Sequence, residues 1–191
     1  MVKGIVFDLD GTLLDSQLCF SSIKKALGIP ENYLILEYLE TLEPEEKLEK
    51  IRVLEEIELQ AAMKSELFPG AKEIFGRINN HGLRIGILTR NCAQVMTWFL
   101  QAFPELQVDH FITREHAPPK PSPQGLHEFS KRWGLAPTEL LMVGDSHLDM
   151  ECGLNAGTKT AWFKQSSSHN SVEVDYIIEH LDELGSILDG L

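Results

Sequence analysis

The chain has 191 residues, of which 43% are hydrophobic, and it carries a formal net charge of −12. This length and composition suit one globular domain, or one domain with a modest insertion, and they exclude a disordered chain. The acidic balance argues against nucleic-acid and anionic-membrane partners, because both are bound through basic surface.

The three cysteines of the chain, Cys19, Cys92 and Cys152, are widely spaced and form no Cys-x-x-Cys pair. We therefore expect neither a disulfide framework nor a zinc cluster, and a reducing compartment fits. The N-terminus lacks the features of a signal peptide, and no apolar run approaches the roughly 18 residues of a membrane-spanning helix. The sequence indicates a cytoplasmic protein, as a monomer or a homodimer, that does not bind a membrane.

The first predicted element is a buried strand over residues 2–8, with Asp8 and Asp10 at its C-terminal tip. In an extended segment, residues i and i+2 point the same way, so both carboxylates should flank one reacting centre. Gly11 then allows the backbone to turn sharply away. Because open α/β sheets bind ligands at this end of their strands, the acid pair is the first candidate site.

The next segment, residues 16–67, is rich in glutamate, has helical spacing and shows no strand-like runs. Helices are predicted over 16–27, over 31–40 and from Pro44 onward. An apolar stripe marks the third helix and consists of Leu48, Ile51, Leu54, Ile57 and Ala61. We expect an all-helical insertion over 16–67, with the glutamates of 37–58 on a solvated face.

From residue 68 onward, predicted strands and helices alternate. Strands are expected at 83–89, 111–113, 140–145, 160–163 and 176–178, and helices up to 80, over 91–103, over 123–133, up to 156 and over 180–188. This alternation predicts an α/β fold with a doubly wound, mainly parallel, Rossmann-like sheet. Residues 1–15 and 68–191 would form this core, and the polar stretch 166–170 is expected to be a loop.

Four short segments resemble the motifs of one family in their order. Asp8-Leu9-Asp10-Gly11-Thr12 resembles the first motif of the haloacid dehalogenase (HAD) superfamily of phosphohydrolases. Thr89 at a strand end resembles the second motif, Lys120 among prolines the third, and Gly144–Asp149 the fourth. In this superfamily the position of the predicted helical insertion carries a cap, as in the phosphoglycolate phosphatase-like and β-phosphoglucomutase-like branch.

The resemblance implies a Mg²⁺-dependent phosphatase that works through an aspartyl-phosphate. It makes Asp8 the nucleophile and a Mg²⁺ ligand, while Asp10 gives the metal its backbone carbonyl and acts as general acid and then base. Asp145 would be a further carboxylate ligand of the metal. Asp149 would support a metal-bound water or orient Lys120.

The remaining expected site residues bind the phosphate. The Thr89 hydroxyl and the Arg90 amide can hydrogen-bond a phosphoryl oxygen, and we expect Asn91 beside them to bind substrate. Lys120 offers a compact positive charge to both the nucleophile and the phosphate. The expected substrate is a small phosphorylated metabolite, over which the cap closes to supply specificity. The cap's few cations are Lys24, Lys25, Arg52 and Lys64.

Two other functions stay open at this point. A phosphomutase acting on a sugar phosphate would keep every motif seen here. A non-catalytic HAD-fold binding protein would be expected to have lost the nucleophile, the lysine or the acid pair, and all of these are present. His147, between Asp145 and Asp149, is interpreted as a rim residue and not as a metal ligand, because the partners typical of a zinc site are missing.

Overall fold

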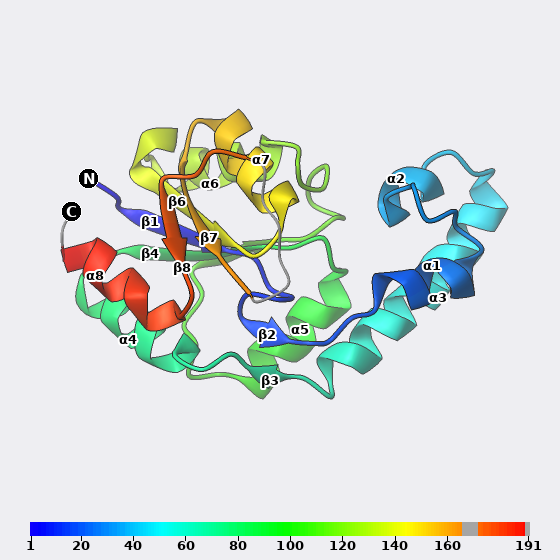
Figure 1. Ribbon diagram of the computed structural model, residues 1–191, viewed down its shortest axis with the longest axis horizontal. Coiled ribbons are helices and arrows are strands. Elements are labelled where there is room, and N and C mark those ends of the chain that lie inside the picture. The colour runs from blue at the N-terminus through cyan, green and yellow to red at the C-terminus, as the bar shows by residue number, and fades with distance from the viewer. Residues whose placement is uncertain (166–171, 190–191) are drawn as a thin grey trace.

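The computed structural model describes residues 1–165 and 172–189, and its centre is a six-stranded sheet (Figure 1). The strands are β1 (Gly4–Phe7), β4 (Arg84–Leu88), β5 (His110–Ile112), β6 (Leu140–Gly144), β7 (Lys159–Phe163) and β8 (Tyr176–Ile178). Their order is β5-β4-β1-β6-β7-β8, and all neighbouring strands are parallel. The predicted doubly wound, mainly parallel α/β sheet is confirmed.

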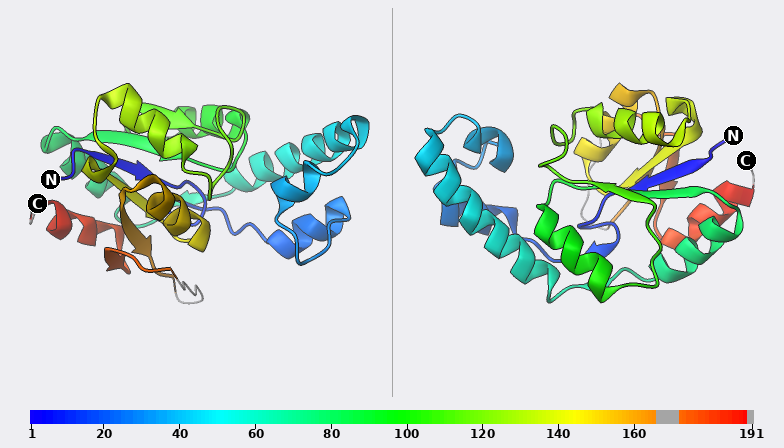
Figure 2. Two further views of the ribbon diagram at one scale, coloured as in Figure 1. Left: turned by 90° about the horizontal axis from the view of Figure 1, so that it is seen from above. Right: turned by 180° about the vertical axis from the view of Figure 1, so that it is seen from behind.

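Helices cover both faces of this sheet (Figures 1 and 2). One face carries α4 (Ala71–Asn80), α5 (Ala93–Ala102) and α8 (Leu184–Asp189), and the other carries α6 (Gln124–Trp133) and α7 (His147–Ala156). Successive side chains of β1 point to opposite faces of the sheet, so Ile5 and Phe7 pack against the first group of helices and Val6 packs against the second. The described residues also form two short 3₁₀ helices, η1 (Pro137–Glu139) and η2 (Leu181–Glu183).

The strand order places a topological switch point beside β1. From β1 the chain moves outward through β4 to β5, and then returns to β6 on the other side of β1. In such sheets a crevice opens at the carboxyl ends of the strands where the order reverses. Asp8 follows β1 and Asp145 follows β6, so both acids lie at this crevice.

A helical insertion extends to one side of the sheet (Figure 1). It contains α1 (Phe20–Leu27), α2 (Ile35–Leu39) and α3 (Pro44–Ala62), and it lies between β2 (Leu14–Asp15) and β3 (Glu66–Leu67). The two short strands pair antiparallel, so the segments that enter and leave the insertion run side by side. The insertion has an apolar cluster of its own, which includes Ile23, Leu27, Leu39 and Leu54.

Several predicted elements differ from the structure. Residues 16–67 do contain a strand, β3, which is too short to show an alternating pattern and exists because it pairs with β2. The predicted helix over 16–27 begins only at Phe20, since Gln17 has a φ of 48°, outside the helical range. The helix predicted over 31–40 is limited to α2, and the one over 180–188 is divided between η2 and α8.

The other predicted strands and helices are confirmed, with ends shifted by a residue or two. The loop predicted at 166–170 lies outside the described residues. Within the part of the chain that the structure describes, no helix combines the length and the apolar character needed to cross a membrane.

Candidate active site

The crevice at the carboxyl ends of β1, β4 and β6 opens into a cavity of about 340 Å³ beneath the helical insertion. Most of the site residues expected from the sequence line this cavity: Asp8, Asp10, Thr89, Arg90, Asn91, Lys120 and Asp145. Asp149 lies close by, fully buried. The fold therefore brings together residues that are up to 141 positions apart (149 − 8).

Lys120 lies between two carboxylates. Its Nζ is 2.6 Å from Oδ1 of Asp8 and 2.6 Å from Oδ1 of Asp149, and its side chain is only 1% exposed. Burial by itself would lower the pKa of this ammonium, but the two adjacent acids outweigh that effect and raise it above its ordinary value. Lys120 is thus held as a fixed positive charge against Asp8.

Asp149 is held by the first turn of α7. Its Oδ2 accepts hydrogen bonds from the Ser146 backbone N–H (3.0 Å) and from Ser146 Oγ (2.5 Å), which is a capping-box arrangement. A Cβ at Gly144 would overlap the Asp149 carboxylate, so only glycine fits at this strand end. One carboxylate oxygen of Asp149 thus bonds to Ser146, and the other lies beside the Lys120 ammonium.

Asp145 is positioned by three neighbours. Thr12 Oγ1 donates to its Oδ1 at 3.3 Å, and the Trp162 indole N–H donates to its backbone carbonyl at 3.1 Å. Gly11 has a φ of +79°, and a Cβ there would fall on the Asp145 carboxylate. Burial, and next the charge of Asp149, raise the pKa of Asp145 to about 7.

Asp8, Asp145 and Asp149 form one acidic cluster, in which one carboxylate oxygen from each residue lies within 4.8 Å of the other two. Burial, and next the charge of Asp149, raise the pKa of Asp8 well above its usual value. Buried carboxylates this close repel one another, and a hard divalent cation would remove that repulsion. The donor set therefore fits such a cation, with oxygen ligands only.

The Asp10 side chain lies apart from this cluster. It accepts a hydrogen bond from the Asn91 side-chain amide and another from Ser16, and burial raises its pKa. The Asn91 backbone N–H donates in turn to Thr89 Oγ1 at 3.0 Å, and Thr89 and Asn91 are both buried. The residues that follow β4 thus form one hydrogen-bonded group beside Asp10.

Arg90 faces the cavity, but its guanidinium is already engaged. Nη1 and Nη2 donate to the two carboxylate oxygens of Glu37 on α2, at 3.0 and 2.7 Å, and Nη1 also donates to the Lys120 carbonyl. Glu37 is exposed, as expected for the glutamates of 37–58, although it pairs with Arg90. The expectation of a solvated face is wrong for Glu58, which is 8% exposed and paired with Arg114.

A family model described as haloacid dehalogenase-like hydrolase matches residues 5–163 of the chain. The chain belongs to this family. An uncharacterised hydrolase of Saccharomyces cerevisiae is 31% identical over 201 residues, which cover 100% of this chain and 92% of that protein. An N-acetylmuramic acid 6-phosphate phosphatase of Pseudomonas putida is 28% identical, with 98% of this chain and 96% of that protein covered.

The structural comparison supports the same fold. The solved structure of a predicted phosphoglycolate phosphatase from Haemophilus somnus superposes with a TM-score of 0.75 at 21% identity, and the match covers 98% of both chains. The haloacid dehalogenase-like hydrolase identified here therefore has the α/β fold of this family, as the sequence motifs predicted.

Sequence reasoning missed several residues around the site of this hydrolase. Ser146 had a visible signal, since Ser-x-x-Asp before a helix is a capping-box pattern. Glu58 also had one, because it lies four residues after Leu54 on the buried face of α3. Glu37 and Arg114 had none, since each takes its role from a partner far away in the chain.

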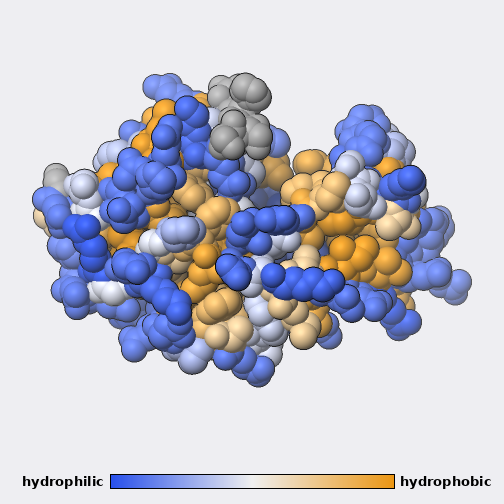
Figure 3. All heavy atoms as spheres, turned by 60° about the horizontal axis from the view of Figure 1, so that its bottom comes forward, coloured by the Kyte–Doolittle hydropathy of each residue, from blue (hydrophilic) through white to orange (hydrophobic). Residues whose placement is uncertain are grey.

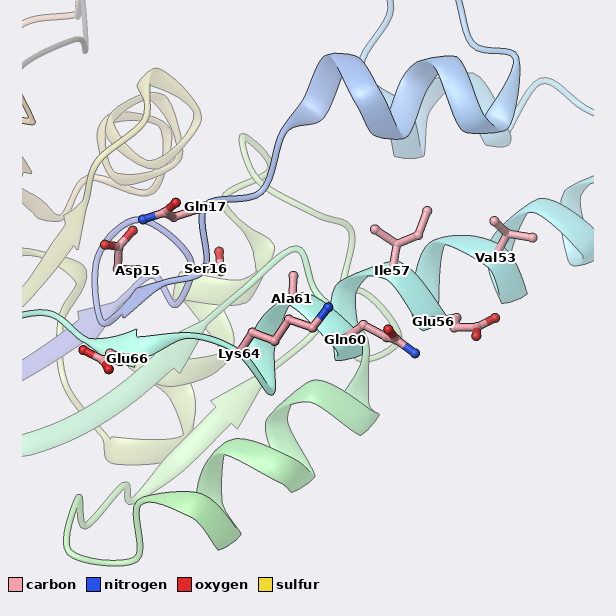
Figure 4. A pocket seen from close by; sticks show the side chains of 10 residues that line it. All are labelled: Asp15, Ser16, Gln17, Val53, Glu56, Ile57, Gln60, Ala61, Lys64 and Glu66. Atoms are coloured by element: carbon pink, nitrogen blue, oxygen red, sulfur yellow. The ribbon is translucent and has the colours of Figure 1, made fainter.

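The four cations singled out in the helical insertion lie in different places. Lys24 lines the cavity, whereas Lys64 lines a different cleft of about 760 Å³, between the linker at Asp15–Gln17 and α3 (Figure 4). Lys25 and Arg52 line neither space. His147 is exposed at the edge of the cavity, as expected for a rim residue.

Proposed function

We propose that this hydrolase is a phosphatase that releases inorganic phosphate from a small phosphomonoester through an aspartyl-phosphate on Asp8. The observation that carries the proposal is the position of the Asp8 carboxylate. It lies in the cavity at the tip of β1, 2.6 Å from the ammonium of Lys120 and beside Asp145. A carboxylate can attack phosphorus directly and divide hydrolysis into two easier steps.

In the first step, an Asp8 oxygen bonds to phosphorus as the bond from phosphorus to the leaving oxygen breaks. Asp10 gives its proton to that oxygen, a role that suits an acid whose pKa is raised by burial. In the second step, Asp10 takes a proton from water, and the water oxygen attacks phosphorus. The bond to Asp8 then breaks, and phosphate leaves.

Phosphoryl transfer depends mainly on positioning and on neutralising charge on the phosphoryl oxygens. The Lys120 ammonium provides a fixed positive charge, and the Thr89 hydroxyl and the backbone N–H groups after β4 offer hydrogen bonds. Thr89 and Lys120 are both buried, 3% and 2% exposed, so solvent screens their interactions little. The name of the Pseudomonas relative supports hydrolysis of a phosphate ester.

We propose Mg²⁺ as the cofactor, held by the Asp8 and Asp145 carboxylates and the Asp10 backbone carbonyl, with Asp149 adjacent. When bound, it would neutralise charge on the phosphoryl oxygens and help to align the phosphorus with Asp8. Its charge would also lower the pKa of Asp8 and keep the nucleophile ionised, which burial alone opposes.

We propose further that residues 16–67 act as a cap over the core formed by 1–15 and 68–191. Support comes from the separate apolar cluster of the insertion and from its position above the cavity. The free thiols of Cys19, Cys92 and Cys152 suit a protein of the cytoplasm.

The deciding experiment measures phosphate release from a panel of phosphomonoesters, with Mg²⁺, for the wild type and Asp8→Asn. The amide of asparagine can still lie near Lys120 but cannot form the acyl-phosphate, so the variant should fold and lose essentially all turnover. Asp15→Asn is the control, because this exposed acid lies on β2 outside the cavity. Substantial turnover by folded Asp8→Asn would rule out the nucleophile.

A further inference from the structure

The cavity has two unlike parts. Its floor, at the strand ends, is lined by acids and Lys120, whereas the side formed by the insertion is largely apolar. That apolar side includes Leu18, Phe20, Ile23, Leu34, Ile35 and Leu54. If the phosphoryl group lies on the floor, this apolar side surrounds the leaving group.

Two of these apolar side chains are exposed to solvent. Phe20 is 60% exposed and Leu34 is 39% exposed, although large apolar side chains are usually covered. Figure 3 shows apolar surface on the insertion next to the notch that separates it from the rest of the protein. Apolar surface that lines an open cavity gains free energy when a ligand covers it.

The cations that line the described cavity are each already engaged. Lys120 is paired with Asp8 and Asp149, and Lys24 donates to the Glu31 backbone carbonyl at 2.6 Å. The two terminal nitrogens of the Arg90 guanidinium both donate to the carboxylate of Glu37.

The pairing of Arg90 is the decisive one, because a two-pronged guanidinium is the group that would bind a second anion of the substrate. An entering carboxylate would have to displace Glu37, and so would exchange one ion pair for an equivalent one while losing its own hydration.

We infer that the leaving group of the substrate is uncharged and mainly apolar, an aryl or alkyl alcohol, and that Glu37 is a specificity-determining residue because it occupies Arg90. This inference rests on the proposed phosphatase activity and narrows its substrate class. It disfavours phosphoesters with a carboxylate or a second phosphate in the leaving group.

The test compares phenyl phosphate with 4-carboxyphenyl phosphate in the presence of Mg²⁺. The two esters differ by one distal carboxylate, and any electron withdrawal by that group would assist the leaving group, so chemistry alone does not favour phenyl phosphate. The wild type should have a kcat/KM at least about ten-fold higher for phenyl phosphate, equivalent to roughly 1.4 kcal/mol.

The Glu37→Gln variant removes the carboxylate that pairs with the Arg90 guanidinium. It should reduce the ratio of kcat/KM for phenyl phosphate to that for 4-carboxyphenyl phosphate several-fold, mainly by lowering the KM of the carboxylated ester. Glu40→Gln is the matched control, because Glu40 follows α2 and pairs with Lys47 outside the cavity. Leu34→Gln should raise the KM for phenyl phosphate, whereas Leu48→Gln, at an exposed leucine on α3 away from the cavity, should not.

The outcomes separate the two proposals. Equal kcat/KM values for the two esters, or a preference for the carboxylated one, would overturn the inference and leave the phosphatase assignment standing. If Glu37→Gln keeps the wild-type ratio of the two kcat/KM values, Glu37 does not determine specificity. If neither ester is hydrolysed and other phosphomonoesters also resist, the phosphatase proposal fails, and this inference fails with it.

Discussion

The Glu58 carboxylate on α3 accepts hydrogen bonds of 2.7 and 2.8 Å from Nη1 of Arg114, in the segment after β5. Both side chains are 9% exposed, and the same nitrogen also donates to the Arg90 backbone carbonyl at 3.1 Å. A buried ion pair therefore joins the helical insertion to the core, next to the residues that follow β4.

Removing one partner of this pair should be costly. Glu58→Ala would leave Arg114 buried without its carboxylate, and Nη2 of Arg114 already lacks a hydrogen-bond partner among the described residues. We expect a loss of about 3–5 kcal/mol in the free energy of unfolding, measured by chemical denaturation. Glu56→Ala, at an exposed position on α3, should stay within about 0.5 kcal/mol of the wild type. Similar losses for both variants would contradict a special role for Glu58.

The pH dependence of stability should carry a contribution from Glu58. Burial outweighs the attraction of Arg114 and raises the pKa of this carboxyl from 4.5 to about 7. The native state then binds a proton more readily than the unfolded state between those values, so the contribution of Glu58 to stability falls as pH rises through this window. The stability of wild type minus that of Glu58→Gln should decrease from pH 4.5 to about 7 and stay level above. A difference that does not change with pH would show that folding does not raise the pKa of Glu58.

Mg²⁺ affinity should depend on pH for a related reason. Burial and Asp149 raise the pKa of Asp145 to about 7, and protonation of a ligating carboxylate competes with the metal. The affinity, measured by calorimetry, should weaken as pH falls below about 7 and level off above it. Asp145→Asn should bind the ion weakly at every pH.

Turnover should depend on the metal. A chelator should stop turnover, Mg²⁺ should restore it, and Ca²⁺ should inhibit it because Ca²⁺ is larger and its coordination is looser. Full turnover in excess chelator would contradict a metal role.

Asp10→Asn should slow both chemical steps but keep the nucleophile. General acid–base catalysis contributes about 10²–10⁴-fold, so losses of that order are expected on alkyl phosphates. An aryl leaving group needs little protonation, so with an aryl ester the substitution should slow the first step less than the second. Phosphoenzyme should then accumulate and be trapped by rapid quenching. Equal losses on both kinds of ester, with no trapped phosphoenzyme, would make Asp10 a structural acid only.

Gly144 should be essential for the position of Lys120. A Cβ at this residue would overlap Asp149, which holds the lysine, so Gly144→Ala should lower both stability and turnover, the latter by about ten-fold or more. Gly76→Ala is the matched control, because nothing lies near a Cβ at that point of α4, and it should stabilise the protein by about 0.5–1 kcal/mol. Wild-type kcat in Gly144→Ala would show that Asp149 has room to move.

The sequence alone was enough to predict the sheet and the acidic centre. Buried strands such as β6 are short apolar runs, and the helices between them end at glycines such as Gly134 and Gly157, so local chemistry marks the elements. Asp8 and Asp145 follow strands, and parallel strands present their carboxyl ends at one edge, so their meeting could be anticipated.

Only the tertiary structure decided how charged groups pair across the chain. The partners Glu37 and Arg90 are 53 positions apart, and Glu58 and Arg114 are 56 apart. A glutamate on a solvated face and one buried against an arginine have the same local sequence preferences, because pairing depends on where the insertion folds back over the sheet. Chain folding therefore determined which cations remain available in the cavity, while local sequence determined the elements that carry them.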